Sequence, residues 1–385
     1  MRTLDQIEPR EPITELPHTI TESGSYYLTG PLETSGNGIT VAADNVSIDL
    51  NGFTLRGGGE GFGTGIFVEE VDNVTIRNGR IHEFNHGISL QNSNYGRMEA
   101  LELSNHFTNG IWIRAISGSC NGHRIRDVTV SHNGLRGLYL QANEGGVLRG
   151  NIISNVRAVG NGLNGISIAA NEGVATGNIV RDGKVLGNAG FTGLDVFSQN
   201  GGHSAGNVIE NMKVLENEHS GLRLIAFGAG STNTGNIVRN NLVKGNGNQI
   251  PALSVQGSSN GQANGNLLEN NAVRDNQQWG IYLDSSLSVG TSRGNVIRNS
   301  TVSGNSTYGI RLDGNTEGTR LENNVVSDHP TGISLGSSKS FVFKNTLFGN
   351  DNGITAGSGN FIGPTIVGGS GEIGNAINPW ANFAP

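Results

Sequence analysis

Cysteine occurs only once in the 385 residues, at Cys120, so no intrachain disulfide can form. Proline is scarce at 9 residues, and the 61 glycines show no three-residue period, which excludes a collagen-like helix. Charged residues make up 15% of the chain, too few for a disordered or coiled-coil protein. No apolar run reaches the length of a membrane-spanning helix. What remains is a glycine-rich folded chain, and its 35% of hydrophobic residues suggests a thin core.

The net charge of −7 comes without any basic block, so nucleic acid is not expected to be the main partner. The chain opens on the polar stretch Met1–Asp5, which does not resemble a signal peptide. Two expectations follow: a cytosolic protein, or a secreted or cell-surface protein that has lost its leader. The second fits better with the family resemblance described below. The sequence does not indicate an oligomeric state.

An internal repeat is the strongest positive signal. A Gly-Asn pair is followed by two apolar residues, and an Asn or Asp stands five residues after the glycine. Six copies begin at Gly150, Gly177, Gly206, Gly235, Gly265 and Gly294. The polar residues are Asn155, Asp182, Asn211, Asn240, Asn270 and Asn299, and weaker copies put Asp127, Asn323 and Asn345 at the same place. Six residues later a second polar column follows: Asn133, Asn161, Asn188, Asn217, Asn246, Asn276 and Asn305.

A second motif, Gly-apolar-x-apolar, follows this column in each unit. Its copies start at Gly38, Gly65, Gly87, Gly110, Gly137, Gly165, Gly193, Gly221, Gly280, Gly309, Gly332 and Gly353, with a degenerate copy at Ala252–Val255. Such a period indicates stacked units rather than separate domains. The segments are short, alternate in polarity and are rich in Ile, Val and Leu, so they are expected to be strands.

The sequence therefore predicts an all-β, right-handed, single-stranded parallel β-helix of about 12–13 coils. Residues 1–35 are expected to form an N-terminal cap, 36–365 the β-helix and 366–385 a C-terminal capping tail. The Asn and Asp columns are interpreted as scaffolding, because these residues tolerate the left-handed turns between strands and stacked amides can bond to one another.

One side of the rod is favoured as a binding surface. Longer loops follow the second motif in the middle coils, and such insertions usually border a binding face. They are Gln141–Arg149, Ala169–Thr176, Phe197–Ala205, Ile225–Thr234, Gln256–Asn264 and Asp284–Arg293. The residue x of the motif points away from the core. Up the rod it is Ser89, Trp112, Tyr139, Ser167, Asp195, Arg223, Ser254, Tyr282, Arg311 and Ser334.

Aromatic and cationic residues on this face suit an extended sugar chain, since rings stack on pyranose faces and Arg pairs with uronate or sulfate groups. The predicted substrate-binding residues are Trp112, Tyr139, Trp279, Tyr282, Tyr308 and Arg114. The alternative is an ordinary exposed sheet stabilised by cross-strand pairs.

Two groups of residues could carry chemistry. Asp284 and Asp313 share one outward position on adjacent coils, about 5 Å apart, beside Arg311. They could divide acid and base roles, bind calcium, or form a surface salt-bridge cluster. No other metal and no organic cofactor is indicated.

The second group is Asp195 with Arg223 on the next coil, with Tyr139, His203 and His219 nearby. A uronate lyase needs a cation for the carboxylate and a base for the C5 proton. The alternative is a structural Asp–Arg pair. The remaining histidines, His86, His123 and His132 among them, lack metal-ligand spacing and are expected at turns or on the surface. Cys120 is expected to be inert.

With these motifs the chain resembles the parallel β-helix proteins of the pectate-lyase-like superfamily over residues 36–365. The segments Gly24–Thr29 and Pro379–Phe383 are similar to secreted bacterial β-helix proteins of unassigned function. The resemblance implies binding or cleavage of polysaccharide, although the catalytic motifs of pectate lyases and polygalacturonases are missing. A lyase or glycoside hydrolase is favoured; a non-catalytic carbohydrate-binding or cell-surface rod and a structural fibre protein remain open.

Overall fold

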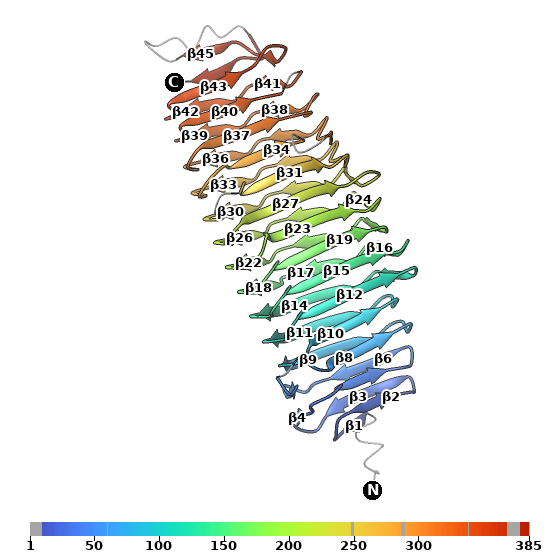
Figure 1. Cartoon of the computed structure of the whole chain (residues 1–385). Coiled ribbons are helices and arrows are strands. Elements are labelled where there is room, and N and C mark those ends of the chain that lie inside the picture. Colours follow the sequence, from blue (N-terminus) through green and yellow to red (C-terminus); the bar gives the residue numbers. More distant parts are fainter. Residues whose placement is uncertain are drawn as a thin grey trace.

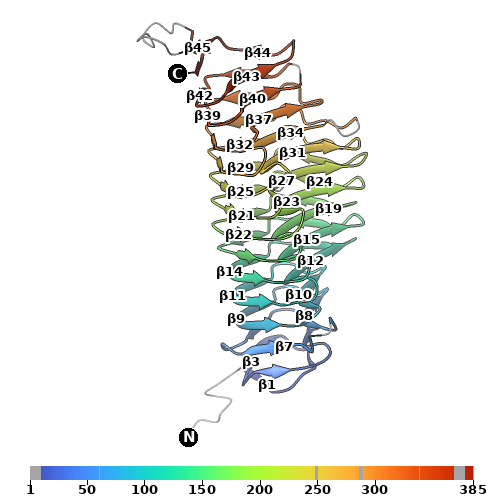
Figure 2. The same cartoon turned by 60° about the vertical axis from the view of Figure 1, so that its left-hand side comes forward.

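The computed structural model describes residues 10–59, 61–247, 250–285, 289–337, 339–367 and 378–384. Every regular element in these ranges is a β-strand, and the strands form the rungs of one elongated solenoid (Figures 1 and 2). The solenoid has about 11 turns, slightly fewer than the repeat predicted. The described part of the chain contains no helix with the length and apolarity needed to cross a membrane.

Sheet 1 is formed by the Gly-apolar-x-apolar motif and has 14 parallel strands in chain order. Its strands are β2 (His18–Ile20), β5 (Ile39–Val41), β8 (Thr64–Glu69), β10 (His86–Gln91), β12 (Ile111–Ile116), β15 (Leu138–Asn143), β19 (Ile166–Asn171), β23 (Thr192–Gln199), β27 (Ser220–Phe227), β31 (Leu253–Ser258), β34 (Ile281–Asp284), β37 (Tyr308–Asp313), β40 (Thr331–Leu335) and β43 (Asn352–Ala356).

Sheet 2 has 27 strands in two parallel ladders. The first ladder contains β1 (Glu11–Ile13), β3 (Gly24–Leu28), β6 (Val46–Asp49), β9 (Thr75–His82), β11 (Arg97–Ser104), β14 (Arg124–Ser131), β17 (Ile152–Ser154), β21 (Ile179–Arg181), β25 (Val208–Glu210), β29 (Ile237–Arg239), β32 (Leu267–Glu269), β35 (Val296–Arg298), β38 (Arg320–Glu322), β41 (Phe341–Phe343) and β44 (Phe361–Ile362). The second contains β4 (Leu32–Glu33), β7 (Thr54–Arg56), β18 (Arg157–Val159), β22 (Lys184–Leu186), β26 (Lys213–Leu215), β30 (Leu242–Lys244), β33 (Ala272–Arg274), β36 (Thr301–Ser303), β39 (Val325–Ser327), β42 (Thr346–Phe348), β45 (Thr365–Val367) and β46 (Asn382–Ala384), and it passes through the long strands β9, β11 and β14.

Sheet 3 occupies much of the region that the sequence assigned to loops. Its five strands are β13 (Ser119–Asn121), β16 (Val147–Arg149), β20 (Val174–Thr176), β24 (His203–Ala205) and β28 (Thr232–Thr234). Isolated bridges at Gln262 continue its pairing toward Thr291. The prediction that these segments are loops was therefore wrong where sheet 3 forms. Three-residue strands between Asn and Gly turns show too few apolar residues to be recognised in the sequence. Within Asp284–Arg293, residues 286–288 lie outside the described residues.

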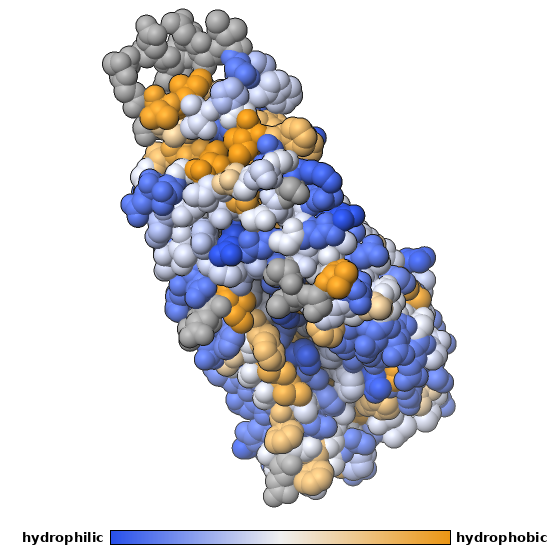
Figure 3. Space-filling view, turned by 45° about the horizontal axis from the view of Figure 1, so that its top comes forward, coloured by the Kyte–Doolittle hydropathy of each residue, from blue (hydrophilic) through white to orange (hydrophobic). Residues whose placement is uncertain are grey.

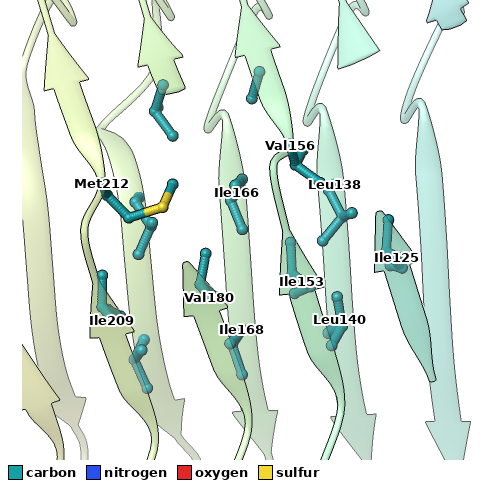
Figure 4. Close-up of a cluster of buried hydrophobic side chains, with 14 of the residues drawn as sticks. Ile125, Leu138, Leu140, Ile153, Val156, Ile166, Ile168, Val180, Ile209 and Met212 are labelled. Carbon is teal, nitrogen blue, oxygen red and sulfur yellow. The ribbon is translucent and has the colours of Figure 1, made fainter. Parts of the chain in front are cut away.

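The core is a single column of aliphatic side chains between the sheets. Leu140 and Ile168 of sheet 1 face Ile153 and Val180 of sheet 2, and all four are at most 1% exposed (Figure 4). Burying one such side chain contributes about 1.5–3 kcal/mol. Each coil adds only a few of these residues, so stability accumulates along the rod.

The first predicted polar column lies at the bend between the two ladders of sheet 2. Asn155, Asp182 and Asn211 all have φ between 50° and 58°, as the turn prediction required. In the last copy this conformation belongs to Lys344, with φ of 59°, and not to Asn345. Asn345 is the next residue and is fully buried.

The second predicted column is a buried ladder of amides. The side chain of Asn188 donates to Oδ1 of Asn217 at 2.9 Å, and the backbone N–H of Asn188 donates to the same oxygen at 3.1 Å. The pattern repeats from Asn133 to Asn305. Two further ladders of the same kind occur, and the first is formed by the asparagines of the Gly-Asn pairs, which the sequence marked as part of the repeat but not as a ladder. They are Asn151–Asn178–Asn207–Asn236–Asn266–Asn295 and Asn241–Asn271–Ser300–Asn324–Asn345–Asn382.

Histidines take the place of asparagine at the lower end of two ladders. Nδ1 of His123 accepts from the backbone N–H of Gly96 at 3.0 Å, and Nδ1 of His106 accepts from that of Phe84 at 3.2 Å. His123 lies at the turn between β13 and β14, as one of the two expectations had it, but it is 0% exposed, so the alternative of a surface position was wrong. Burial lowers the pKa of His123 to about 4 and that of His106 to about 3.

Acid is therefore expected to destabilise the fold through these two imidazoles. Their folded pKa values lie below the ordinary value of 6.5, so the unfolded chain binds more protons and stability falls as the pH drops from about 6.5 toward 4. Each histidine contributes a slope of about 1.4 kcal/mol per pH unit. The variant His123→Asn keeps the ladder acceptor and should remove one such slope in urea unfolding followed against pH. The exposed His203→Asn is the control, and equal slopes in both variants would contradict the assignment.

The terminal segments join the same sheets. In the N-terminal segment, β1 pairs with β3 and β2 with β5, whereas residues 1–9 lie outside the described residues. At the other end β46 pairs with both β42 and β45. Residues 368–377 and 385 of the predicted tail lie outside the description. Hydrophobic side chains also gather on the surface near this end of the rod (Figure 3).

Candidate functional site

The outward row of sheet 1 has the register that the repeat predicted. Ser89, Trp112, Tyr139, Ser167, Asp195, Arg223, Ser254, Tyr282, Arg311 and Ser334 are Cα partners in successive strands. The flanking Ile, Leu and Val side chains are buried in the core, so the residues between them point to the opposite side. We call the surface between Trp112 and Asp313 the sheet 1 face.

A first aromatic group lies at the lower end of this face. The rings of Trp112 and Tyr139 are nearly parallel, with centroids 6.5 Å apart, and His86 lies 4.8 Å from Trp112. The guanidinium of Arg114 lies 4.9 Å from the centre of the Trp112 ring, and that of Arg136 lies 4.2 Å from that of Tyr139. These contacts fix the rings as a rigid platform flanked by two positive charges.

The imidazole of His86 and the phenol of Tyr139 are both kept neutral by their surroundings. Burial, followed by the charge of Arg114, lowers the pKa of His86 to about 4. Burial also raises the pKa of the Tyr139 phenol above its ordinary value, against the opposing effect of Arg136. The lower platform therefore presents neutral rings, with its charge carried by the arginines.

A second aromatic group lies five coils above Tyr139. Trp279 lies 4.5 Å from Tyr282 and 6.2 Å from Tyr308, measured between ring centroids. Arg311 stands 4.9 Å from the centre of the Trp279 ring and 4.7 Å from that of Tyr308. The predicted binding residues thus form two separate clusters instead of one continuous row.

The two upper carboxylates are in register, as predicted, but their surroundings differ from a simple acid–base pair. Asp284 and Asp313 are Cα partners on β34 and β37. Oδ2 of Asp313 accepts from Nε of Arg311 at 2.6 Å and from the hydroxyl of Tyr282 at 3.2 Å. Asp284 is only 5% exposed. Asp313 therefore forms an ion pair with Arg311, which favours the salt-bridge interpretation.

Between the two aromatic groups the face is polar and charged. Asp195 and Arg223 are Cα partners, and Oδ2 of Asp195 lies 3.6 Å from Nη2 of Arg223. Asp195 is 4% exposed and Ser254, the next residue of the row, is fully buried. The sequence predicted that these residues point outward but not that they are buried, because burial depends on the side chains of the neighbouring coils.

Several polar atoms in this central part have no hydrogen-bond partner among the described residues. They are Oδ1 of Asp195, Nε of Arg223, Nδ1 of His219 and the hydroxyl oxygens of Thr192, Ser220 and Ser254. All come from β23, β27, β31 or the residue before β27. Buried polar atoms are normally paired, so such a cluster calls for water or a ligand. The sequence placed Ser254 in the outward row without making it a candidate site residue, and it did not point to Thr192 or Ser220, which stand just before the glycine of their motifs.

His203 and Cys120, to which the sequence also drew attention, are not among these residues without partners. His203 lies on β24 of sheet 3, where its Nδ1 is 3.0 Å from the hydroxyl of Thr232. Cys120 is buried, and burial raises the pKa of its thiol to about 11, which agrees with an inert side chain. No group of three or more His, Cys, Asp or Glu side chains in the described ranges could hold a metal ion.

Comparison with protein families identifies the repeat. The model described as "Right handed beta helix region" matches residues 114–288 and 252–369. A second model, described as periplasmic copper-binding protein (NosD), matches residues 34–190. No curated protein matches the chain in sequence.

Solved structures share the fold at low sequence identity. A mutant of the periplasmic alginate epimerase AlgG is 13% identical, with a TM-score of 0.57, covering 80% of this chain and 76% of its own. The catalytic domain of a GH87 α-1,3-glucanase in complex with tetrasaccharides is 16% identical, with a TM-score of 0.54 and coverages of 91% and 63%. The A-module of the Azotobacter vinelandii mannuronan C-5 epimerase AlgE6 is 17% identical, with a TM-score of 0.50 and coverages of 94% and 89%. At these identities the similarity establishes the fold alone.

Proposed function

The chain belongs to the right-handed β-helix family, and on this scaffold we propose that it binds an extended acidic polysaccharide along the sheet 1 face. The observation that carries the proposal is the cluster of unpartnered polar atoms around Asp195 and Arg223, which lies between two aromatic groups. A sugar chain offers hydroxyls and carboxylates for such atoms and pyranose faces for the rings.

The dimensions of the face fit a polymer better than a small molecule. Tyr139 and Tyr282 are five strands apart, which corresponds to about 24 Å at the spacing of paired strands. Several sugar rings are needed to span that distance. The arginines at both aromatic groups and at the centre favour an acidic polymer over a neutral one.

The central residues suit the removal of a proton next to a carboxylate. Arg223 would neutralise a uronate carboxylate, and Asp195 would act as the base, since its Oδ1 has no hydrogen-bond partner among the described residues. Loss of the C5 proton is the first step of a uronate lyase and also of a C5 epimerase. The structural neighbours include two epimerases of the alginate type, which supports a uronate polymer as substrate.

A glycoside hydrolase is the second candidate, and it would use Asp284 and Asp313. The two residues are Cα partners on adjacent strands, so their carboxylates could approach to the separation of about 5 Å that retaining hydrolysis requires. The bonds from Arg311 and Tyr282 to Asp313 count against this site. Calcium at the same pair remains a proposal, to be tested with a chelator in each assay. A non-catalytic rod is the third candidate, and a periplasmic or extracellular location suits all three.

A panel of polymannuronate, polygalacturonate and a neutral glucan tests the proposal. We expect saturable binding of the uronates, together with unsaturated products or inverted C5 centres by NMR. Reducing ends without unsaturation would instead identify a hydrolase. Binding without any product would leave a carbohydrate-binding protein, and absence of binding to every acidic polymer would contradict the proposed function.

The upper aromatic group should contribute measurably to binding. We expect Trp279→Ala to weaken uronate binding about tenfold, because the variant loses the ring that packs on Tyr282 and Tyr308. Isothermal titration measures the change. The control is Phe348→Ala, which removes a 42% exposed ring from sheet 2. Equal affinities of the two variants would show that the upper aromatic group is not part of the binding surface.

A further inference from the structure

A cavity of about 510 Å³ on sheet 2 is lined by residues of β9, β11, β14 and β17 and of the turns between strands. These strands lie in the lower half of the rod (Figure 1). The lining of the cavity includes Asn73, Thr75, Tyr95, Arg97 and Arg124. The sheet 1 face is built from other strands, so this cavity is not part of the proposed polysaccharide surface. None of the residues that line the cavity is acidic.

The cavity places two arginines side by side. Arg97 and Arg124 are Cα partners on β11 and β14, which puts their backbones about 4.8 Å apart. Like charges directly opposite each other destabilise a sheet. Neighbouring arginines of sheet 2 avoid this by pairing: Arg77 lies 3.1 Å from Asp49, and Arg126 lies 3.3 Å from Glu99. Within the described ranges no ion pair is formed by Arg97 or Arg124.

Other residues give the cavity a fixed shape. Tyr95 has φ of 60°, and its ring lies over Gly122, where an added Cβ would be only 2.8 Å from Cδ1 of the tyrosine. The ring is 57% exposed and forms a wall beside the arginines. The hydroxyl of Thr75, the partner of Arg97 on β9, adds a polar group on the other side.

We propose that Arg97 and Arg124 bind a sulfate or phosphate group in this cavity. A guanidinium group can donate two parallel N–H bonds to the oxygens of a tetrahedral oxyanion, and two such groups line this cavity. Such a ligand would also relieve the repulsion between the two charges. The cavity is larger than a single oxyanion, so it has room for a sugar carrying the group as an ester. The net charge of −7 makes this a local positive site on an acidic protein.

Titration with four ligands tests the proposal and separates its two sources. They are inorganic phosphate, inorganic sulfate, glucose 6-phosphate and glucose 6-sulfate. We expect saturable binding to the wild-type protein, and at least tenfold weaker binding to Arg97→Gln and to Arg124→Gln. Tighter binding of the esters would identify a substituted sugar as ligand, and equal affinities would identify the free anion; both support the site.

The matched control is Arg126→Gln, which removes a neighbouring arginine that already has a carboxylate partner. It should bind the anions as tightly as the wild-type protein. Without any anion, Arg97→Gln and Arg124→Gln should be at least as stable to heat as the wild-type protein, because the repulsion is gone. Absence of saturable binding to all four ligands, or an equal loss in Arg126→Gln, would overturn the proposal.

Discussion

Replacing Asp195 with asparagine is expected to lower the rate of uronate turnover by about 100-fold or more. The amide has the shape of the carboxylate but cannot take up the C5 proton. Affinity for the polymer should change only a few-fold, because Arg223 and both aromatic groups remain in place. Rate and affinity are measured separately, by product formation at saturating polymer and by calorimetric titration.

Asp313→Asn is the matched comparison for this variant. Asp313 belongs to the same outward face but is already bonded to Arg311 and Tyr282. A lyase or epimerase centred on Asp195 should keep most of its rate in this variant. The reverse pattern, with Asp313→Asn inactive and Asp195→Asn active, would assign the reaction to Asp284 and Asp313 and favour hydrolysis.

Replacing Asn188 with alanine should destabilise the fold by about 2–4 kcal/mol. Asn188 is fully buried, and its Oδ1 accepts from both the backbone N–H and the side chain of Asn161, at 3.0 and 2.8 Å. Alanine leaves these donors in the core without that acceptor and also leaves a cavity. Urea unfolding gives the total loss, and hydrogen exchange should show it concentrated in the coils beside Asn188.

The control for Asn188 is Asn155→Ala, in the other predicted column. Asn155 is exposed, and its side-chain amide donates to Oδ1 of Asp127 at 2.6 Å. Alanine at its φ of 50° should cost about 1 kcal/mol. If the two variants lose equal stability, the buried ladder contributes no more than the turn conformation, and the interpretation of the ladders is wrong.

The candidate site was predicted only in part. The order of Trp112, Tyr139, Asp195, Arg223 and Tyr282 along the face follows from a period of two, because each strand repeats one pattern of inward and outward residues. The ring contacts within each aromatic group could not be predicted, since they depend on side-chain rotamers and on residues before the glycine of each motif.

The hydroxyls of Thr192 and Ser220 were missed for a related reason, and Ser254 was placed in the outward row but not among the candidate site residues. Serine and threonine are common on exposed strands. They indicate a candidate site only when their hydroxyls are buried without a hydrogen-bond partner. Sheet 3 was missed because its three-residue strands lie between glycines and asparagines, which the sequence pattern shares with loops.

The sequence by itself determined the parallel β-helix, the register of its strands and the direction in which each side chain points. These follow from a repeat in which every unit needs its neighbours to bury its apolar residues and to pair its strands. The tertiary structure alone decided which outward residues are buried, which charges are paired and which polar atoms are left without partners. These properties arise between coils, where side chains 20 to 30 residues apart meet. They distinguish the Asp195–Arg223 ion pair, 3.6 Å long and with Oδ1 and Nε left without hydrogen-bond partners among the described residues, from the hydrogen-bonded Arg311–Asp313 pair at 2.6 Å.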